Sequence, residues 1–164
     1  MMNRSKDNIF YWADGCRLTP CASKYIDTIS NILHKDYPKL RCDCFDGIYA
    51  WDSDAFEKGR RKSRSSNTVD MVLSLNPGMM LMVEAKLDVE NVQQLKGEVE
   101  YKIQKTKEYL VSSTSFVCCI NPSIVLFSSD NFERKKTRYR KMRCNKTDID
   151  PMTIAAFYDY IEKY

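Results

Sequence analysis

Three charged residues stand in the most apolar part of the chain. Asp70 lies in the run 68–75, and Glu84 and Lys86 lie in the run 79–87. Charged side chains are rarely buried unless they are paired or bind a metal ion. Two carboxylates suit Mg²⁺ or Mn²⁺, which prefer oxygen ligands, and an ammonium group beside them can balance the charge of a phosphate. The combination points to metal-assisted chemistry on a phosphate ester.

The spacing predicts that the three side chains meet. The two runs read as strands joined by the turn sequence NPG, in which Pro77 presets one central residue and Gly78 tolerates the positive φ of the next. If the strands pair about this turn, Asp70 lies opposite Glu84. Residues two apart on a strand share a face, so Lys86 points to the same side as Glu84.

Two interpretations of this arrangement remain open. Like charges directly opposite each other are destabilising unless something compensates them. A divalent cation held by Asp70, Glu84 and the Ala85 carbonyl would do so, and Lys86 would then orient or help to deprotonate the attacking water, or balance the developing charge. The alternative is an ion pair of Lys86 with Asp70 or Glu84. The E-x-K pattern recurs at 100–102 and in the basic run, but only the first copy lies in an apolar strand.

Positive charge is concentrated in two segments. Residues 57–64 hold five bases and one acid, residues 133–146 hold eight bases and one acid, and acids outnumber bases elsewhere, although the net charge is only +4. Such clustering is expected of a protein that meets a polyanion; the alternative is two solvated basic faces. The residues that we assign to contact with a nucleic-acid backbone are Arg60, Arg61, Lys62, Arg64, Arg138 and Arg140.

The elements expected to position these residues alternate in type. In chain order they are a helix over 20–37, a strand at 44–51, a loop over 52–66, strands at 68–75 and 79–87, a helix over 89–111, strands at 114–120 and 123–129, and a helix over 151–164. The pattern of residues 131–146 does not decide between helix and strand. The order predicts one domain with a mixed sheet and helices packed against it.

Residues 68–86 resemble the core signature of the PD-(D/E)XK nuclease superfamily. That family carries an acid on one strand and E-x-K on the next, here Asp70 and Glu84-Ala85-Lys86. Its αβββαβ core also resembles the elements expected over residues 20–120. The resemblance implies an α/β, restriction-endonuclease-like fold with a mixed central sheet flanked by helices. The single domain would cover 1–164, with a core over about 20–128 and a C-terminal basic segment and helix over 129–164.

The resemblance also implies roles and partners. Asp70 and Glu84 would bind Mg²⁺ or Mn²⁺, and Lys86 would assist hydrolysis of a phosphodiester, with DNA as the partner. Many members carry an acid on the first helix, where this chain offers only Asp27 and Asp36, and a polar residue on the helix after E-x-K, for which we choose Gln94. Many such enzymes act as homodimers to cut two strands.

Several other residues are of types that can bind a metal ion, catalyse a reaction or stack on bases. Cys16, Cys21, Cys42 and Cys44 do not have the usual spacing of a zinc site, so scattered reduced thiols are favoured. His34 is interpreted as a surface or packing residue, and Trp12 and Trp51 as buried rather than stacked on bases. No apolar run is long enough to span a membrane, and no secretory signal is visible. A cytoplasmic location is therefore expected.

These observations favour a Mg²⁺-dependent nuclease acting on DNA, either as an endonuclease or an exonuclease. A second hypothesis is a non-catalytic module on the same fold that binds nucleic acid or protein. A third is a protein-interaction partner, such as an immunity-type protein, in which the three charges form an ion pair.

Overall fold

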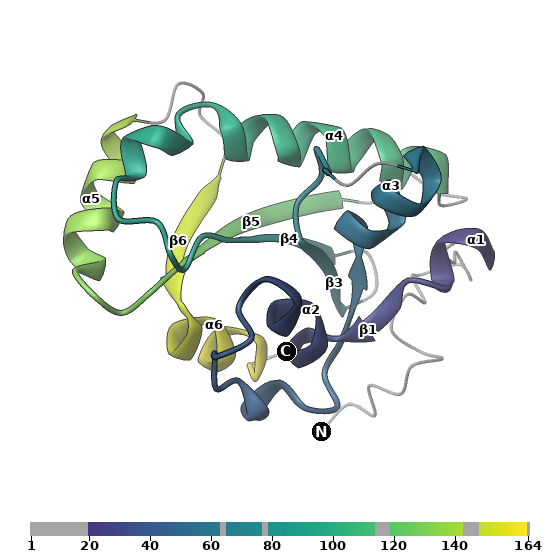
Figure 1. Cartoon of the computed structure of the whole chain (residues 1–164), viewed down its shortest axis with the longest axis horizontal. Coiled ribbons are helices and arrows are strands. Elements are labelled where there is room, and N and C mark those ends of the chain that lie inside the picture. The colour runs from purple at the N-terminus through teal and green to yellow at the C-terminus, as the bar shows by residue number, and fades with distance from the viewer. Residues whose placement is uncertain (1–19, 63–64, 77–78, 114–118, 143–147, 164) are drawn as a thin grey trace.

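The computed structural model describes residues 20–62, 65–76, 79–113, 119–142 and 148–163, and it shows an α/β fold on a six-stranded mixed sheet (Figure 1). The strands are β1 (Ile26–Thr28), β2 (Tyr49–Asp52), β3 (Met71–Asn76), β4 (Met79–Ala85), β5 (Cys119–Phe127) and β6 (Ile149–Thr153). Their order in the sheet follows their order in the chain. The first four pair antiparallel with their neighbours, whereas β4, β5 and β6 are parallel.

Helices cover both faces of this sheet. They are α1 (Pro20–Ser23), α2 (Ile29–Asp36), α3 (Ser53–Arg61), α4 (Glu98–Ser113), α5 (Phe132–Met142) and α6 (Ile154–Ile161), with short 3-10 turns η2 (Asp43–Phe45) and η3 (Val92–Leu95). In Figure 1, α3, α4 and α5 lie on one side of the sheet, and α2 and α6 lie on the other. Within the described residues, no helix is both long enough and apolar enough to cross a membrane.

Alternation along β3 and β4 divides the core into two layers. Val72, Met80 and Met82 pack in one apolar cluster with residues of α4, including Val99 and Ile103. Leu73, Leu81, Val83 and Ala85 belong to the other cluster, with residues of α2 and α6 such as Ile32 and Phe157. Because side chains of a strand alternate in direction, Asp70, Glu84 and Lys86 belong to the face that α4 covers.

The predicted helix over 20–37 is wrong as a continuous element. It is divided into α1, the edge strand β1 and α2. Ile26 pairs with Trp51 and Thr28 pairs with Tyr49, and the side chain of Thr28 accepts a hydrogen bond from the Asn31 N–H to cap α2. Residues 26–28 therefore pair with the edge of β2 although their apolar spacing fits a helix. Here tertiary contacts override the local preference for helix.

The second predicted helix, over 89–111, also begins later than expected. Gly97 has φ of +76° and separates η3 from α4. That left-handed conformation is open to Gly at little cost and disfavours most other residues. The turn at Gly97 redirects the chain so that α4 crosses back over the sheet to reach β5, a parallel neighbour of β4.

The predicted loop over 52–66 contains helix α3. Asp52 caps it by accepting the Ala55 N–H at 2.7 Å, and Phe56 packs on Trp51 with ring centroids 5.1 Å apart. Gly59 is required by close approach, because a Cβ at this position would collide with the hydroxyl of Tyr25. The segment is polar enough to resemble a loop, and long-range packing makes it helical.

Two further elements differ from expectation, and a third, the basic segment, was left undecided by its sequence. β5 is continuous through Asn121-Pro122, and its register with β4 shifts near Pro122, which has no N–H to donate. Residues 151–153 belong to β6 rather than to the last helix, and Pro151 is tolerated because β6 is an edge strand. The basic segment forms helix α5. Residues 77–78 of the predicted NPG turn lie outside the described residues.

The start of β3 is fixed to α4 by one buried hydroxyl. Thr106 is fully buried, its Oγ1 donates to the Lys102 carbonyl at 2.8 Å, and it accepts the Val69 N–H at 2.9 Å. This bond holds the backbone directly before Asp70 against the helix that covers it.

Thr106→Val is expected to lower the free energy of unfolding by about 1–3 kcal/mol, because the Val69 N–H is left buried without an acceptor. Urea unfolding of wild type, Thr106→Val and Thr106→Ser measures the loss. The Ser variant keeps the hydroxyl and should lose less. Equal stability of wild type and the Val variant would contradict this role.

Candidate functional site

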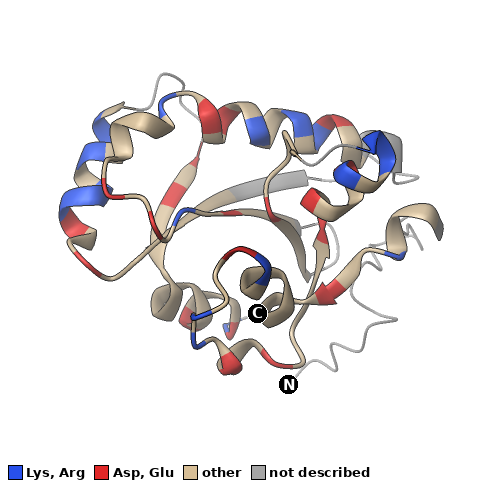
Figure 2. Cartoon of the chain, viewed as in Figure 1, with Lys and Arg blue, Asp and Glu red and all other residues tan. Residues whose placement is uncertain are grey.

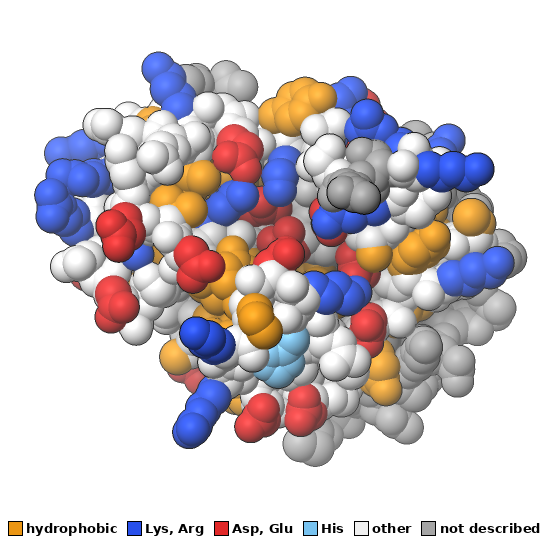
Figure 3. Space-filling model, viewed as in Figure 1, with side chains coloured by type: hydrophobic (Ala, Val, Ile, Leu, Met, Phe, Trp, Pro, Cys, Tyr) orange, Lys and Arg blue, Asp and Glu red, His pale blue; other side chains and the backbone are white. Residues whose placement is uncertain are grey.

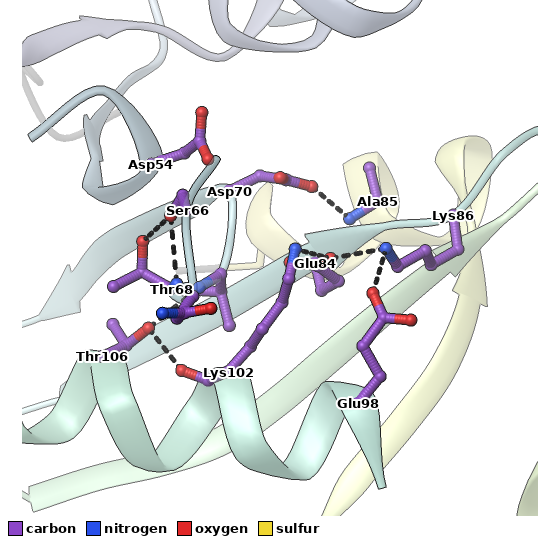
Figure 4. A network of polar contacts seen from close by, with 12 residues as sticks. Asp54, Ser66, Thr68, Asp70, Glu84, Ala85, Lys86, Glu98, Lys102 and Thr106 are labelled. Carbon is purple, nitrogen blue, oxygen red and sulfur yellow. Dashed lines mark hydrogen bonds and ion pairs between the residues drawn. The ribbon is translucent and has the colours of Figure 1, made fainter. Parts of the chain in front are cut away.

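The β3–β4 hairpin brings Asp70 and Glu84 to opposite positions. Met71 pairs with Val83, and the same register continues through Leu73 and Leu81. Asp70 directly precedes Met71 and Glu84 directly follows Val83, so the predicted register is confirmed. The Ala85 N–H donates to Asp70 Oδ2 at 2.7 Å. Figure 4 shows these residues at the end of the hairpin, above α4.

The Asp70 carboxyl is in an unfavourable place for a negative charge. Burial raises its pKa well above the usual value, and the nearby Glu84 raises it further. The hydrogen bond from Ala85 and the ammonium groups of Lys102 and Lys86 oppose the shift without cancelling it. The site therefore favours a proton or another cation at Asp70.

Glu84 is the most deeply placed charge of the cluster. The residue is 1% exposed, and its Oε1 accepts from Lys102 Nζ at 2.6 Å and lies 3.0 Å from Lys86 Nζ. Its Oε2 is buried and has no hydrogen-bond partner among the described residues. A buried carboxylate oxygen without a partner is costly in the absence of a ligand.

Lys86 lies between two carboxylates. Its Nζ lies 2.7 Å from Glu98 Oε1 and 3.0 Å from Glu84 Oε1. Burial alone would lower the pKa of this ammonium, but the charges of Glu84 and Glu98 outweigh it and raise the pKa above the usual value. Lys86 is therefore held as a cation and does not act as a base in this state.

Helix α4 supplies residues that sequence reasoning missed. Lys102 and Glu98 stand one turn apart near its start, and both reach the residues at the end of β4 (Figure 4). Their i, i+4 spacing on the helix that follows E-x-K was visible in the sequence. Their meeting with Glu84 and Lys86 depended on where α4 crosses the sheet.

Tyr37, at the end of α2, also joins the site. Its hydroxyl donates to the Ala85 carbonyl at 3.0 Å, and it accepts the Leu87 N–H at 3.3 Å. Burial, with a smaller contribution from the charge of Asp70, raises the pKa of Tyr37 to about 12. The carbonyl that we expected as a metal ligand therefore already has one partner, and it keeps a second lone pair.

The other predicted residues lie elsewhere. Gln94 is exposed on η3. Arg61 pairs with Glu57 at 3.0 Å, Arg60 lies over the Tyr109 ring, and Lys62 ends α3 with φ of +51°. Arg138 is exposed on α5, and Arg140 pairs with Asp150 at 2.8 Å. Arg64 lies outside the described residues.

The alternative sites fare differently. His34 Nε2 lies 2.6 Å from the Leu40 carbonyl oxygen, which agrees with a packing role. Cys42 is buried, whereas Cys21 and Cys44 are exposed. The described part of the chain contains no group of three or more His, Cys, Asp or Glu residues arranged to hold a metal ion. Trp51 is buried, as expected; Trp12 and Cys16 lie outside the described residues.

The donor set nevertheless suits a hard divalent cation. Its atoms are all oxygens, from the carboxylates of Asp70 and Glu84 and the carbonyl of Ala85, as Mg²⁺ prefers. The unpartnered Oε2 of Glu84 offers a lone pair that no protein group among the described residues uses. Figure 3 shows acidic side chains recessed between basic side chains on this face of the molecule.

Comparison with protein-family models, with curated proteins and with solved structures gave no match.

Asp70→Asn is expected to stabilise the metal-free protein at neutral pH. Because folding raises the pKa of this carboxyl, the proton stabilises the fold fully below the unfolded-state pKa, and this contribution is lost as the pH rises through the folded-state pKa. The uncharged amide removes that loss. The gain should be at least the roughly 0.2–1 kcal/mol of a cross-strand pair.

Urea unfolding in EDTA across a pH series tests this expectation. The advantage of Asp70→Asn should shrink as the pH falls. Asp130→Asn, at an exposed position, controls for the loss of a surface carboxylate. A variant that is less stable than wild type at neutral pH would show that the carboxylate is not a destabilising charge.

Proposed function

We propose that this chain is a Mg²⁺-dependent (or Mn²⁺-dependent) nuclease that hydrolyses phosphodiester bonds of DNA on a restriction-endonuclease-like core. The observation that carries the proposal is the buried Glu84, whose Oε2 has no partner among the described residues, directly opposite Asp70 and beside Lys86. A fold rarely keeps a buried carboxylate directly opposite a second carboxylate without a group to compensate them.

The order of elements supports this proposal. α2 precedes β2, β3 and β4, and α4 then leads to β5, which is an αβββαβ order within the larger sheet. Asp70 comes directly before β3, and Glu84 ends β4 with Ala85. The resemblance of residues 68–86 to the PD-(D/E)XK signature thus occurs in the expected structural context.

The metal would be held by Asp70, Glu84 and the Ala85 carbonyl. When bound, Mg²⁺ supplies Lewis-acid polarisation of the phosphate and a lower pKa for a water molecule. The raised pKa of Asp70 means that this carboxyl gains from a cation at neutral pH. Lys102 holds Glu84 by Oε1, which leaves Oε2 as the free ligand atom.

Lys86 is assigned an electrostatic role. Hydrolysis adds a water oxygen to phosphorus and breaks the bond to a sugar oxygen, with negative charge growing on the phosphate oxygens and the leaving oxygen. Because Glu84 and Glu98 keep Lys86 protonated, it can stabilise this charge and hold the phosphate in place. It does not accept the proton of the attacking water in this state.

DNA is the proposed partner because basic residues gather on the helices of this face. Figure 2 shows Lys and Arg along α3, α4 and α5. We further propose a cytoplasmic enzyme, in which the free thiols of Cys21, Cys42 and Cys44 stay reduced. Two copies would be needed to cut both strands at once, so a homodimer is part of this proposal.

One observation favours a non-catalytic nucleic-acid-binding module instead. Glu84 already has two ammonium partners, Lys86 and Lys102, and such a network can be a self-sufficient structural ion cluster. Under this alternative the chain binds DNA without any need for metal.

Glu84→Gln is expected to reduce metal-dependent cleavage of DNA by at least about 100-fold, because a removed metal ligand weakens binding and transition-state stabilisation together. Cleavage of a labelled oligonucleotide with Mg²⁺ or Mn²⁺ measures it. Glu108→Gln, which removes an exposed carboxylate that pairs with Lys105 outside the cluster, is the matched control. A folded Glu84→Gln protein that still cleaves at the wild-type rate would refute the assignment.

Calorimetric titration with Mg²⁺ and Mn²⁺ separates the two functions. The nuclease predicts binding that disappears in Asp70→Asn, since this variant keeps the shape of the side chain and loses its charge. The binding module predicts no metal binding and a DNA affinity that falls with salt but is indifferent to EDTA.

A further inference from the structure

A large groove opens beside the carboxylate cluster. It has a volume of about 1050 Å³ and lies between the segment after α2, the loop after β4 and helix α5. Tyr37 and Leu87 line it, and the Tyr37 hydroxyl connects them to the end of β4, since it donates to the Ala85 carbonyl and accepts the Leu87 N–H. Asp70, Glu84 and Lys86 do not line the groove, so Tyr37 and Leu87 are the residues that connect it to the cluster.

Four of the charged residues that line the groove form no ion pair with any described residue. Arg134 and Arg138 stand one turn apart on α5, are exposed, and form no ion pair with any described residue. Asp88 and Glu90, on the loop after β4, are also without ion-pair partners among the described residues. Elsewhere on α5 the situation differs, because Lys136 pairs with Glu133.

The arrangement of these charges discriminates between ligands. Three of the four bases that line the groove come from α5. The loop after β4 carries two acids and Asn91, and Asp36 and Asp130 are the other two acids of the lining. Figure 3 shows Lys and Arg gathered over α5 with Asp and Glu beside them. A duplex presents phosphates on both of its edges, so one strand would lie against Asp88 and Glu90. A single strand has phosphates on one edge and base donors on the other.

We propose that this groove binds a single strand of nucleic acid, with its phosphates along Arg134 and Arg138 and its bases toward Asp88, Glu90 and Asn91. Carboxylates accept from the amino groups of bases, and Asn pairs with adenine. The volume of the groove, about 1050 Å³, is at the upper end of the roughly 300–1,000 Å³ of small-ligand pockets, so it is large enough for a short piece of a strand. The inference deepens the proposed function, on which its link to cleavage rests: the substrate is a single strand or an unpaired end.

Fluorescence anisotropy of a labelled single strand of about twelve nucleotides, in EDTA, tests the groove without cleavage. Arg134→Gln/Arg138→Gln should weaken binding about tenfold. The association constant should also fall less steeply with salt, with a slope of log K against log salt that is smaller in magnitude by about 1.4, because each phosphate contact on a single strand contributes about 0.7. The matched control, Lys136→Gln/Lys141→Gln, removes the same charge from α5 outside the groove and should change neither quantity.

Three outcomes would overturn the groove. They are unchanged binding by the Arg double variant, an equal loss in the Lys double variant, and tighter binding of the corresponding duplex than of the single strand. DNA and RNA strands of one sequence are compared in parallel, and binding of either through Arg134 and Arg138 supports the shared chemistry. Circular dichroism confirms that each variant is folded.

This experiment separates the groove from the proposed nuclease. Strand binding through Arg134 and Arg138 without cleavage in Mg²⁺ or Mn²⁺ supports the proposed binding of a strand in the groove and contradicts the proposed nuclease activity. The opposite result is cleavage that depends on Glu84 and whose kcat/KM on single strands is the same in the Arg double variant. It supports the proposed nuclease activity and contradicts strand binding in the groove.

Discussion

The burial of Glu84 beside Asp70 is the constraint on which this site depends. Two carboxylates at opposite positions of a hairpin, in the layer between the sheet and α4, would repel each other strongly in a medium of low dielectric constant. The ammonium groups of Lys86 and Lys102 both contact one oxygen of Glu84 and offset part of this repulsion. It leaves Asp70 with a raised pKa and the second oxygen of Glu84 without a partner among the described residues. The negative charge of the two carboxylates is therefore only partly compensated by the described residues.

The helix that supplies this compensation is placed by backbone geometry and apolar packing. Gly97, in a left-handed conformation, turns the chain into α4, and Val99 and Ile103 anchor that helix on the apolar layer of β3 and β4. Once α4 lies there, its residues one turn apart, Glu98 and Lys102, meet the end of β4. The same burial that stabilises the domain thus fixes the electrostatics of the candidate centre, and neither can change without the other.

The groove and the carboxylate cluster are connected through Tyr37, but they differ in burial and in the pairing of their charges. Glu84, at the centre of the cluster, is buried, and the cluster holds three carboxylates and only two ammonium groups. The groove is open, and its residues Arg134, Arg138, Asp88 and Glu90 form no ion pair with any described residue, which suits binding along a chain. Tyr37 joins them, because its hydroxyl bridges the Ala85 carbonyl and the Leu87 N–H. A strand held by α5 would in this way be presented to the end of β4.

The sequence by itself determined the hairpin register, the shared face of Asp70, Glu84 and Lys86, and the mixed α/β sheet, because turn chemistry and the two-residue period of strands are local. Only the tertiary structure decided that residues 26–28 form an edge strand, that α3 is helical, and that Lys102, Glu98 and Tyr37 join the site. These outcomes depend on which segments meet across the sheet. Contacts between residues far apart in the chain do not alter the hydrophobic periodicity of either segment. They therefore cannot be predicted from the sequence of one segment alone.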